Sequence, residues 1–294
     1  MSYCPRETTG ALRRAQRRGR TTDRGRAAGI SASVAAPAPD VCSTRLREGK
    51  TMANGRTAVI TGASSGIGAA SARRLAAEGF RVVLGARRTD RIQQIADEVG
   101  GSAIALDVTD ADSVRSFLDQ VPECGLLVNN AGGAKGLSTV EEADEAEWRW
   151  MWETNVLGTL RLTKGLLPKL RHSGDGHVIT VTSVAASAVY DKGSGYTAAK
   201  HAEAALHQTL RGEHLGEPLR FTEIAPGMVE TEFSEVRLGD AERAAAVYQG
   251  LQPLSADDVA DVIAFAATRP SHVNLDHIEL KPRAQASATR AHRE

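Results

Sequence analysis

A short apolar segment, a glycine-rich turn and a helical segment follow one another over residues 57–79, and this succession constrains the fold most strongly. Residues 57–61 (TAVIT) form a β-branched run typical of a buried parallel strand. Gly62, Gly66 and Gly68 follow, and then a helical pattern over residues 69–78 that Gly79 ends. A structural turn is one interpretation. The order of the three segments favours a dinucleotide site, because glycines let the backbone approach a pyrophosphate and a helix N-terminus offers it free N–H groups.

The same alternation of strand and helix continues to the end of the chain. Further strands are expected at residues 80–85, 103–106, 125–128, 177–182, 220–225 and 277–280, and helices at residues 88–99, 110–120, 196–210 and 257–267. We therefore expect an α/β fold, a doubly wound parallel sheet of the Rossmann type, in a single domain over residues 52–286. Residues 287–294 are expected to be a frayed tail.

The first 51 residues differ in composition from the rest. They are rich in Arg, Ala, Pro and Ser, lack apolar periodicity and carry a charge of +7. We expect this basic extension to be disordered, and either an inert tail or a stretch that is not translated if synthesis starts at Met52. A transit peptide and a nucleic-acid-binding arm are the alternatives. An export signal is disfavoured because the apolar segment after Arg17 and Arg18 is weak.

Composition excludes several classes of protein. The chain is neutral overall, so residues 52–294 carry −7, which argues against nucleic acid as a partner. No stretch approaches the roughly 18 apolar residues of a membrane helix, so no membrane partner is expected. Three scattered cysteines suggest neither a disulfide framework nor a metal site and favour a reducing, cytoplasmic location. The eight histidines show no metal-binding spacing, and no metal is expected.

The end of the second expected strand bears on cofactor choice. Arg87 and Arg88 follow this strand, Arg87 lies 19 residues after Gly68, and the first acid is Asp90. In dinucleotide folds an acid near this point selects a free ribose 2′-hydroxyl, whereas an Arg accommodates a 2′-phosphate. The sequence therefore predicts NADP(H) as cofactor. The alternative is a pair of solvated arginines at the start of a helix.

A Tyr–Lys pair and a serine are the candidate catalytic residues. Tyr196 and Lys200 are four residues apart on an expected helix and so share one face. An ammonium beside a phenol favours the phenolate, so we expect Lys200 to lower the pKa of Tyr196 and to suit it for proton transfer. Ser183 follows an apolar strand, at the edge where open α/β sheets bind ligands. Asp107 and Val108, after the third strand, are placed to touch an adenine.

Six motifs together resemble the short-chain dehydrogenase/reductase family. They are TGASSGIG (61–68), NNAG (129–132), Asn155 in TNVLG, Ser183, YTAAK (196–200) and PGMVET (226–231). The resemblance covers about residues 52–282 and implies an enzyme that interconverts a secondary alcohol and a carbonyl. It implies that Tyr196 is the general acid or base, that Lys200 lowers its pKa and holds the nicotinamide ribose, and that Ser183 binds the substrate oxygen. It implies that Asn155 positions a water that links Lys200 to solvent.

The same resemblance, with the chemistry above, gives a set of residues expected to bind the cofactor. These are Gly62, Ser64, Ser65, Gly66, Ile67, Gly68, Arg87, Arg88, Asp107, Val108, Asn130, Ala131, Gly132, Tyr196, Lys200, Pro226, Gly227, Val229 and Thr231. Asn129 is expected to be structural. A homo-oligomer, a tetramer or a dimer, is implied by the resemblance alone.

The substrate is less constrained. Three segments resemble the NADP-dependent 3-hydroxy-acid or serine dehydrogenases: Arg87 and Arg88 after strand two, EFSEVR (232–237) and HVNLDHIELKP (272–282). A small carbonyl or alcohol is therefore the expected partner. Residues 231–250 are expected to form a lid in which Arg237 binds a substrate carboxylate or, alternatively, pairs with Glu235 or Asp240. Tryptophans 148, 150 and 152 are expected to pack or to contact another subunit. The competing function is a nucleotide-sensing regulator or scaffold without turnover.

Overall fold

The computed structural model describes residues 55–294, so the expectations for residues 1–51 lie outside the described part of the chain. In this part, seven strands form one parallel sheet in the order β3-β2-β1-β4-β5-β6-β7. The strands are β1 (Thr57–Thr61), β2 (Arg81–Ala86), β3 (Ser102–Ala105), β4 (Leu126–Asn129), β5 (Gly176–Val181), β6 (Leu219–Pro226) and β7 (His277–Leu280). The sheet confirms the doubly wound α/β fold that the sequence predicted.

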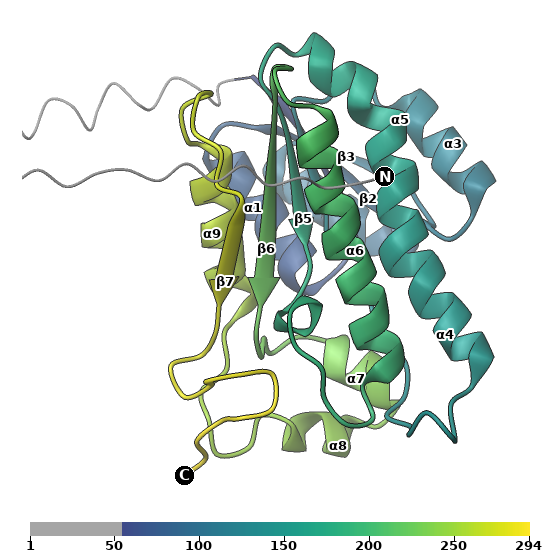
Figure 1. Ribbon diagram of the computed structural model, residues 1–294. Coiled ribbons are helices and arrows are strands. Elements are labelled where there is room, and N and C mark those ends of the chain that lie inside the picture. Colours follow the sequence, from purple (N-terminus) through teal and green to yellow (C-terminus); the bar gives the residue numbers. More distant parts are fainter. Residues whose placement is uncertain (1–54) are drawn as a thin grey trace, which may run out of the picture. The chain divides into compact units, whose positions relative to one another are not determined.

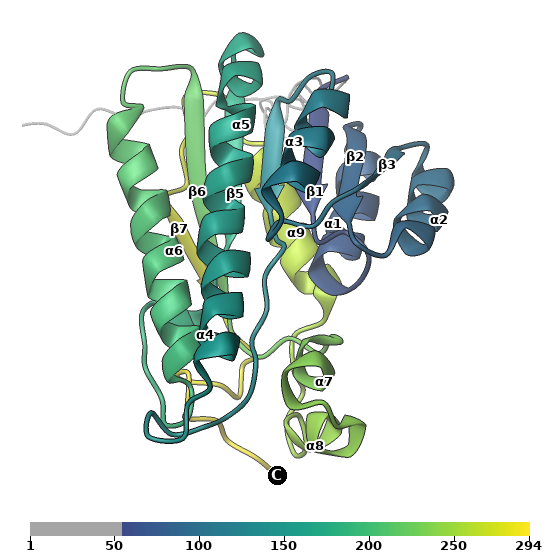
Figure 2. The same cartoon turned by 90° about the vertical axis from the view of Figure 1, so that its right-hand side faces the viewer.

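Helices cover both faces of the sheet (Figures 1 and 2). One face carries α1 (Gly66–Ala77), α2 (Thr89–Val99) and α9 (Ala256–Ala267). The other carries α3 (Ala111–Gln120), α5 (Gly158–His172) and α6 (Ser194–Glu213), with α4 (Glu145–Trp152) and a π-helical turn, η2 (Glu153–Leu157), leading into α5. The central strands β1, β4, β5 and β6 are buried over their whole length, as expected for strands that are covered by helices on both faces, whereas the edge strands β3 and β7 are partly exposed.

The strand order fixes where a ligand can bind. Strand β1 pairs with β2 on one side and with β4 on the other, so the chain moves outward in opposite directions from this point. In open α/β sheets, the crevice at such a switch point opens beyond the carboxyl ends of the strands. Two short helices, α7 (Phe233–Leu238) and α8 (Ala241–Ala246), lie at this edge, beyond the arrowhead of β6 in Figure 1.

Local sequence signals explain the helix boundaries. Asp110 caps α3 by accepting a hydrogen bond from the Asp112 amide. At α9, Ser255 and Asp258 exchange side-chain and backbone hydrogen bonds in a capping box. Before Gly158, the π-helical turn η2 ends with a hydrogen bond from the Gly158 amide to the Glu153 carbonyl.

The last residues of the chain contact the loop after β6 and the segment after α8. Gln285, near the end of the expected domain, is 5% exposed, and its Oε1 accepts a hydrogen bond of 2.8 Å from the Met228 amide. Within residues 287–294, the Arg293 guanidinium donates to the Val247 carbonyl, and the Glu294 amide donates to the Gly250 carbonyl. These hydrogen bonds satisfy backbone groups of both segments.

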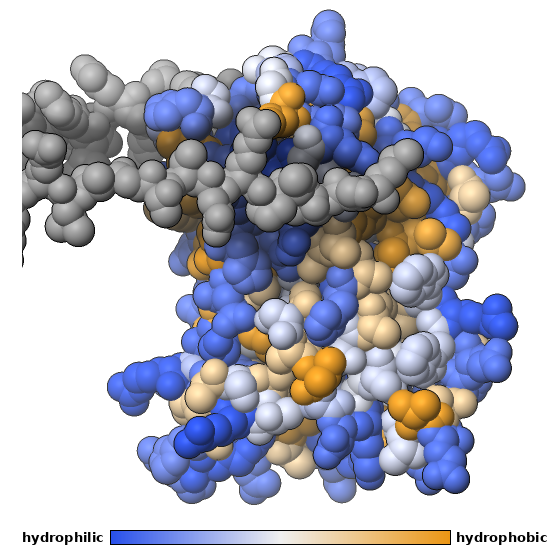
Figure 3. Space-filling view, in the orientation of Figure 1, coloured by the Kyte–Doolittle hydropathy of each residue, from blue (hydrophilic) through white to orange (hydrophobic). Residues whose placement is uncertain are grey.

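The surface of the described residues is mixed. Figure 3 shows hydrophilic side chains around the margin of one face and a paler band over its centre. Large apolar side chains that are exposed include Trp148 and Trp152 of α4. No helix among residues 55–294 is both long and apolar enough to cross a membrane.

Candidate active site

A cavity of about 710 Å³ opens at the carboxyl edge of the sheet and gathers almost all of the residues that the sequence singled out. It is lined by 19 of the 21 predicted cofactor and catalytic positions: Gly62, Ser64, Ser65, Gly66, Ile67, Arg87, Arg88, Asp107, Val108, Asn130, Ala131, Gly132, Ser183, Tyr196, Lys200, Pro226, Gly227, Val229 and Thr231. Gly68 and Asn155 lie behind its wall. Among the described residues, no cluster of acidic, His and Cys side chains could hold a metal ion.

The glycine turn after β1 forms one end of the cavity. Gly62 and Gly66 have positive φ angles of 64° and 52°, which favour glycine. Gly68 is needed for packing, because a Cβ there would lie 2.4 Å from the Gly62 carbonyl oxygen. Ser65 stands at the N-cap of α1 but makes no capping hydrogen bond. The first amides of α1 are thus left without a side-chain cap and suit a phosphate.

Arg88 contacts both serines of the glycine turn. Its guanidinium donates to the hydroxyls of Ser64 (3.1 Å) and Ser65 (2.7 Å) and to the carboxylate of Glu232 (2.7 Å). Arg91 donates to the other oxygen of Glu232, also at 2.7 Å. Hydrogen bonds from Arg88 and Arg91 lower the pKa of Glu232 to about 2. These hydrogen bonds hold Arg88 at the cavity rim. A solvated arginine at the start of a helix was the alternative that the sequence allowed.

Polar side chains join the strand ends beneath the cavity. The Asn130 side chain donates to the Thr61 carbonyl at 3.0 Å, and so links β4 to β1. Asn129 donates to the Thr163 hydroxyl at 2.9 Å inside the core, in line with the structural position expected for it. Asp107 lines the cavity, but its carboxylate accepts two hydrogen bonds from Thr109 and so shapes the turn after β3.

Tyr196 and Ser183 face the same cavity from α6 and from the end of β5. Tyr196 is 8% exposed, and its ring lies 5.6 Å from that of Phe233. Burial raises the pKa of the phenol, and the opposing effects of Lys200 and Ser183 do not outweigh it. The expectation of a lowered pKa for Tyr196 is therefore wrong for the protein without cofactor, because it counted the ammonium and not the loss of water.

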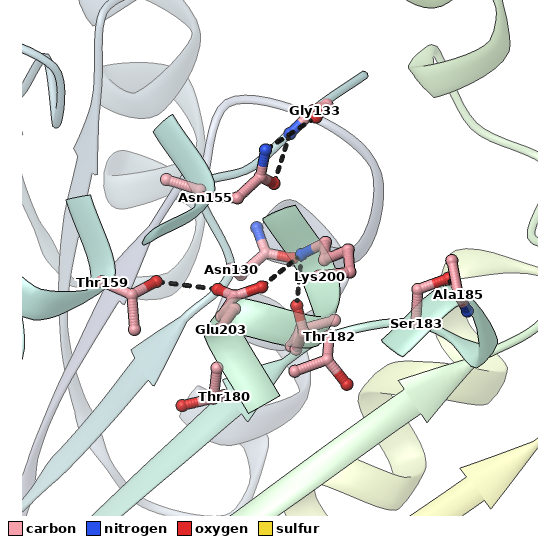
Figure 4. A network of polar contacts seen from close by, with 12 residues as sticks. Asn130, Gly133, Asn155, Thr159, Thr180, Thr182, Ser183, Ala185, Lys200 and Glu203 are labelled. Carbon is pink, nitrogen blue, oxygen red and sulfur yellow. Dashed lines mark hydrogen bonds and ion pairs between the residues drawn. The ribbon is translucent and has the colours of Figure 1, made fainter. Parts of the chain in front are cut away.

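Lys200 makes two hydrogen bonds that the sequence did not predict. Its ammonium donates to the Val181 carbonyl at 3.1 Å. It also donates to the Glu203 carboxylate at 2.7 Å, as Figure 4 shows. The other oxygen of Glu203 accepts from the Thr159 hydroxyl at 2.8 Å. Burial by itself lowers the pKa of Lys200, but the charge of Glu203 and the Tyr196 phenol outweigh it and raise this pKa. Burial also raises the pKa of the Glu203 carboxyl, against the effect of Lys200.

Asn155 lies on the π-helical turn and is fully buried. Its side chain accepts from the Gly133 amide at 3.0 Å and donates to the carbonyls of Gly133 (2.9 Å) and Met151 (2.7 Å). A Cβ on Gly132 would lie 2.7 Å from the Asn155 side-chain oxygen and 3.4 Å from the Lys200 nitrogen. Gly132 therefore allows the loop after β4 to pass between these two polar groups.

The far end of the cavity is lined by α7 and by Val247 and Tyr248, which follow α8. Arg237 of α7 lies with its guanidinium carbon 5.5 Å from the Tyr196 ring centroid and 5.7 Å from that of Tyr190. It donates to the Tyr190 hydroxyl (3.0 Å) and the Gly136 carbonyl (3.2 Å). Among the described residues, Arg237 forms no ion pair with Glu235 or Asp240. The ion pair expected as the alternative to substrate binding is therefore not observed. Trp150 also lines this part of the cavity.

Sequence reasoning missed Glu203 and Glu232. Glu203 is three residues after Lys200, on the same helix face, and this spacing was the available signal. Glu232 offered none, because its partner Arg88 is 144 residues away in the chain.

A strand, a glycine turn and a Tyr–Lys pair that share one cavity define a class of nucleotide-dependent enzyme. The family described as short chain dehydrogenase matches residues 56–241, and the chain belongs to this family. It is therefore an oxidoreductase of the short-chain dehydrogenase type.

Individual relatives narrow the comparison. An uncharacterized oxidoreductase of Mycobacterium tuberculosis is 65% identical over 236 residues, which are 80% of this chain and 94% of the relative. Serine 3-dehydrogenase of Agrobacterium fabrum is 38% identical over 239 residues, 79% of this chain and 96% of that enzyme. The closed form of serine dehydrogenase complexed with NADP+ superposes with a TM-score of 0.77 at 34% identity, covering 81% of this chain and 100% of that one. These relatives support the subgroup and the cofactor that the sequence predicted.

Proposed function

We propose that the protein is an NADP(H)-dependent oxidoreductase that interconverts a secondary alcohol and its carbonyl, with Tyr196 as general acid and base. The observation that carries this proposal is that Tyr196, Lys200 and Ser183 line the same cavity as the glycine turn and Arg88. A nucleotide-sensing regulator would need the turn and the arginine but not a phenol next to an ammonium. Consumption of NADPH with a panel of carbonyl compounds tests the proposal.

The residues present fit NADP(H). The uncapped start of α1 suits the pyrophosphate, Arg88 with Ser64 and Ser65 suits the ribose 2′-phosphate, and Lys200 suits the nicotinamide ribose. The segment Pro226 to Thr231 would lie against the nicotinamide. NADPH, when bound, supplies a hydride to the carbonyl carbon, and NADP+ accepts it in the reverse reaction.

The chain's own residues handle the proton. In reduction, Tyr196 donates its phenolic proton to the substrate oxygen, and in oxidation the phenolate takes that proton back. Ser183 donates a hydrogen bond to the same oxygen and stabilises the charge that develops on it. The Lys200 ammonium stabilises the phenolate, and Asn155 keeps the loop at Gly133 in place beside it. Lys200 would then pass a proton to the Tyr196 phenolate, and a water positioned by Asn155 would replace that proton on Lys200 from solvent.

The substrate is proposed to be a small 3-hydroxy acid whose carboxylate binds Arg237. The guanidinium lies next to the Tyr196 ring, so an anionic group bound there would place a neighbouring hydroxyl at the phenol. The similarity to serine 3-dehydrogenase agrees with a substrate of this kind.

Replacing Arg237 with Ala is expected to raise KM for a 3-hydroxy acid such as serine about 10–100-fold and to change kcat less. The reason is that a charge-assisted hydrogen bond contributes about 1.5–3 kcal/mol. Initial rates of NADP+ reduction measure both constants. An uncharged secondary alcohol should lose little activity in this variant.

Arg243→Ala is the matched control, because Arg243 is an exposed arginine of the same lid. An unchanged KM for the acid in Arg237→Ala would disprove carboxylate binding at this position and leave the proposed reaction standing.

Two further expectations are proposals. A homo-oligomer is supported by the exposure of Trp148 and Trp152, and sedimentation of the purified protein would test it. A cytoplasmic location stays a prediction from the cysteine content.

A further inference from the structure

We propose that Glu203 is a positioning residue that sets the proton affinity of Tyr196 through Lys200, so that the proton-handling unit is a chain of phenol, ammonium and carboxylate. This inference rests on the proposed function of Tyr196 as acid and base. It goes beyond that function because it concerns Glu203, a residue that contacts neither substrate nor cofactor.

The geometry around Lys200 leaves little freedom. An ammonium has three N–H bonds, and two of them are used by the Val181 carbonyl and the Glu203 carboxylate. One N–H is left for the cofactor ribose or a water. The side chains of Lys200 and Glu203 are 5% and 1% exposed, so solvent does not screen the interaction between them. The carboxylate therefore fixes the direction in which the remaining N–H points.

Glu203 is held as an acceptor from two sides. One oxygen accepts from Lys200 on its own helix, and the other accepts from the Thr159 hydroxyl of α5 (Figure 4). Each oxygen thus faces a donor, which suits the ionised form of the group. A buried carboxylate without such donors would be costly.

Charged and titratable groups reach this site from several elements. Glu203 itself faces Lys200 of α6 and a second buried carboxylate, Glu223 of β6, which accepts from the Thr182 hydroxyl at 2.8 Å. The groups that face Tyr196 come from α6, α7 and the loop after β5, and are Lys200, Glu203, Arg237 and Tyr190. Glu203 is the carboxylate in direct contact with the ammonium.

The direction in which Glu203 shifts proton release from the Tyr196–Lys200 pair follows from its charge alone. The phenol and the ammonium lose their first proton as a pair, and a negative charge beside them makes that loss harder. This holds whichever of the two groups releases the proton. Removal of the Glu203 charge must therefore make the pair release its proton at lower pH. In the direction of alcohol oxidation, which needs the phenolate, activity should then persist to lower pH.

The experiment compares the wild type with Glu203→Gln, which keeps the shape of the side chain and removes its charge. The acid limb of the pH profile of kcat/KM for alcohol oxidation is expected to move by about one unit to lower pH. A second readout needs no cofactor: NMR of protein carrying 13C at the tyrosine ring should show the Tyr196 signal titrating at lower pH in the variant. The chain has four tyrosines, and Tyr196→Phe assigns the signal.

Two variants serve as controls. Glu203→Asp keeps the charge, so its acid limb should stay near that of the wild type even if kcat falls. Glu213→Gln removes a charge from an exposed position of the same helix, about 15 Å further along, and should leave the limb in place.

The outcomes separate this inference from the function on which it rests. If Glu203→Gln shows the wild-type acid limb and the wild-type Tyr196 titration, Glu203 is neutral or purely structural and the inference is overturned. If Tyr196→Phe keeps full turnover, the proposed function fails, while the NMR titration still reports on Glu203. If Glu203→Gln does not fold, Thr159→Val keeps the charge of the carboxylate and removes a donor that partly offsets it, so both readouts should move by a smaller amount in the opposite direction, to higher pH. No movement there would equally overturn the inference.

Discussion

Tyr196→Phe is expected to lower kcat for carbonyl reduction by about 10³-fold, the usual contribution of a positioned general acid. The substitution removes one oxygen and keeps the ring, which packs against Phe233 in the wall of the cavity. Fold and nucleotide binding should therefore survive, and the loss should fall on the chemical step. Steady-state rates with saturating NADPH, together with an NADPH titration, distinguish a loss of chemistry from a loss of binding.

Tyr248→Phe is the matched comparison, because it also removes a phenol oxygen from the lining of the same cavity. The Tyr248 hydroxyl is used for a structural contact with the Val229 carbonyl, and its loss should change kcat far less. Equal rates for wild type and Tyr196→Phe would mean that the proton comes from another group.

The double substitution Arg87→Ala and Arg88→Ala is expected to weaken NADPH binding about 10–100-fold and to leave NADH binding nearly unchanged. A phosphate held by a guanidinium fork loses charge-assisted hydrogen bonds, each of about 1.5–3 kcal/mol, whereas NADH has no phosphate at this position. Fluorescence titration of both nucleotides gives the two dissociation constants.

Arg115→Ala controls for the loss of positive charge, because Arg115 forms an exposed ion pair with Asp112 on α3. A ratio of NADPH to NADH affinity that stays at the wild-type value in the double variant would refute the assignment of the 2′-phosphate site.

The fold was predictable because its signals are local. The apolar runs that became β1, β5 and β6 are buried over their whole length, and Gly62 and Gly66 of the first turn have the positive φ angles that the turn demands. The helices expected from residues 110 and 257 begin within one residue of those positions, at Ala111 and Ala256. The positions that line the cavity followed from the resemblance to the family, together with the rule that strand ends meet at one edge.

The interactions that sequence reasoning missed depend on packing. The pKa of Tyr196 could not be inferred from its spacing to Lys200, since burial opposes the ammonium. Glu203 looked like an ordinary polar residue of a helix until its neighbours closed around it. The contact of Gln285 with the loop after β6 joins segments that are 57 residues apart, and local periodicity carries no information about it.

The bridge from Arg88 and Arg91 to Glu232 links the two ends of the cavity. Glu232 is the N-cap of α7, and Arg237 stands near the other end of that six-residue helix. If Arg88 holds the 2′-phosphate as we propose, that phosphate would compete with the Glu232 carboxylate for Arg88. A nucleotide without the phosphate would leave α7 tied to α2. We therefore expect the choice of coenzyme to affect the position of Arg237, and the Michaelis constant of the alcohol to depend on whether the coenzyme carries the 2′-phosphate.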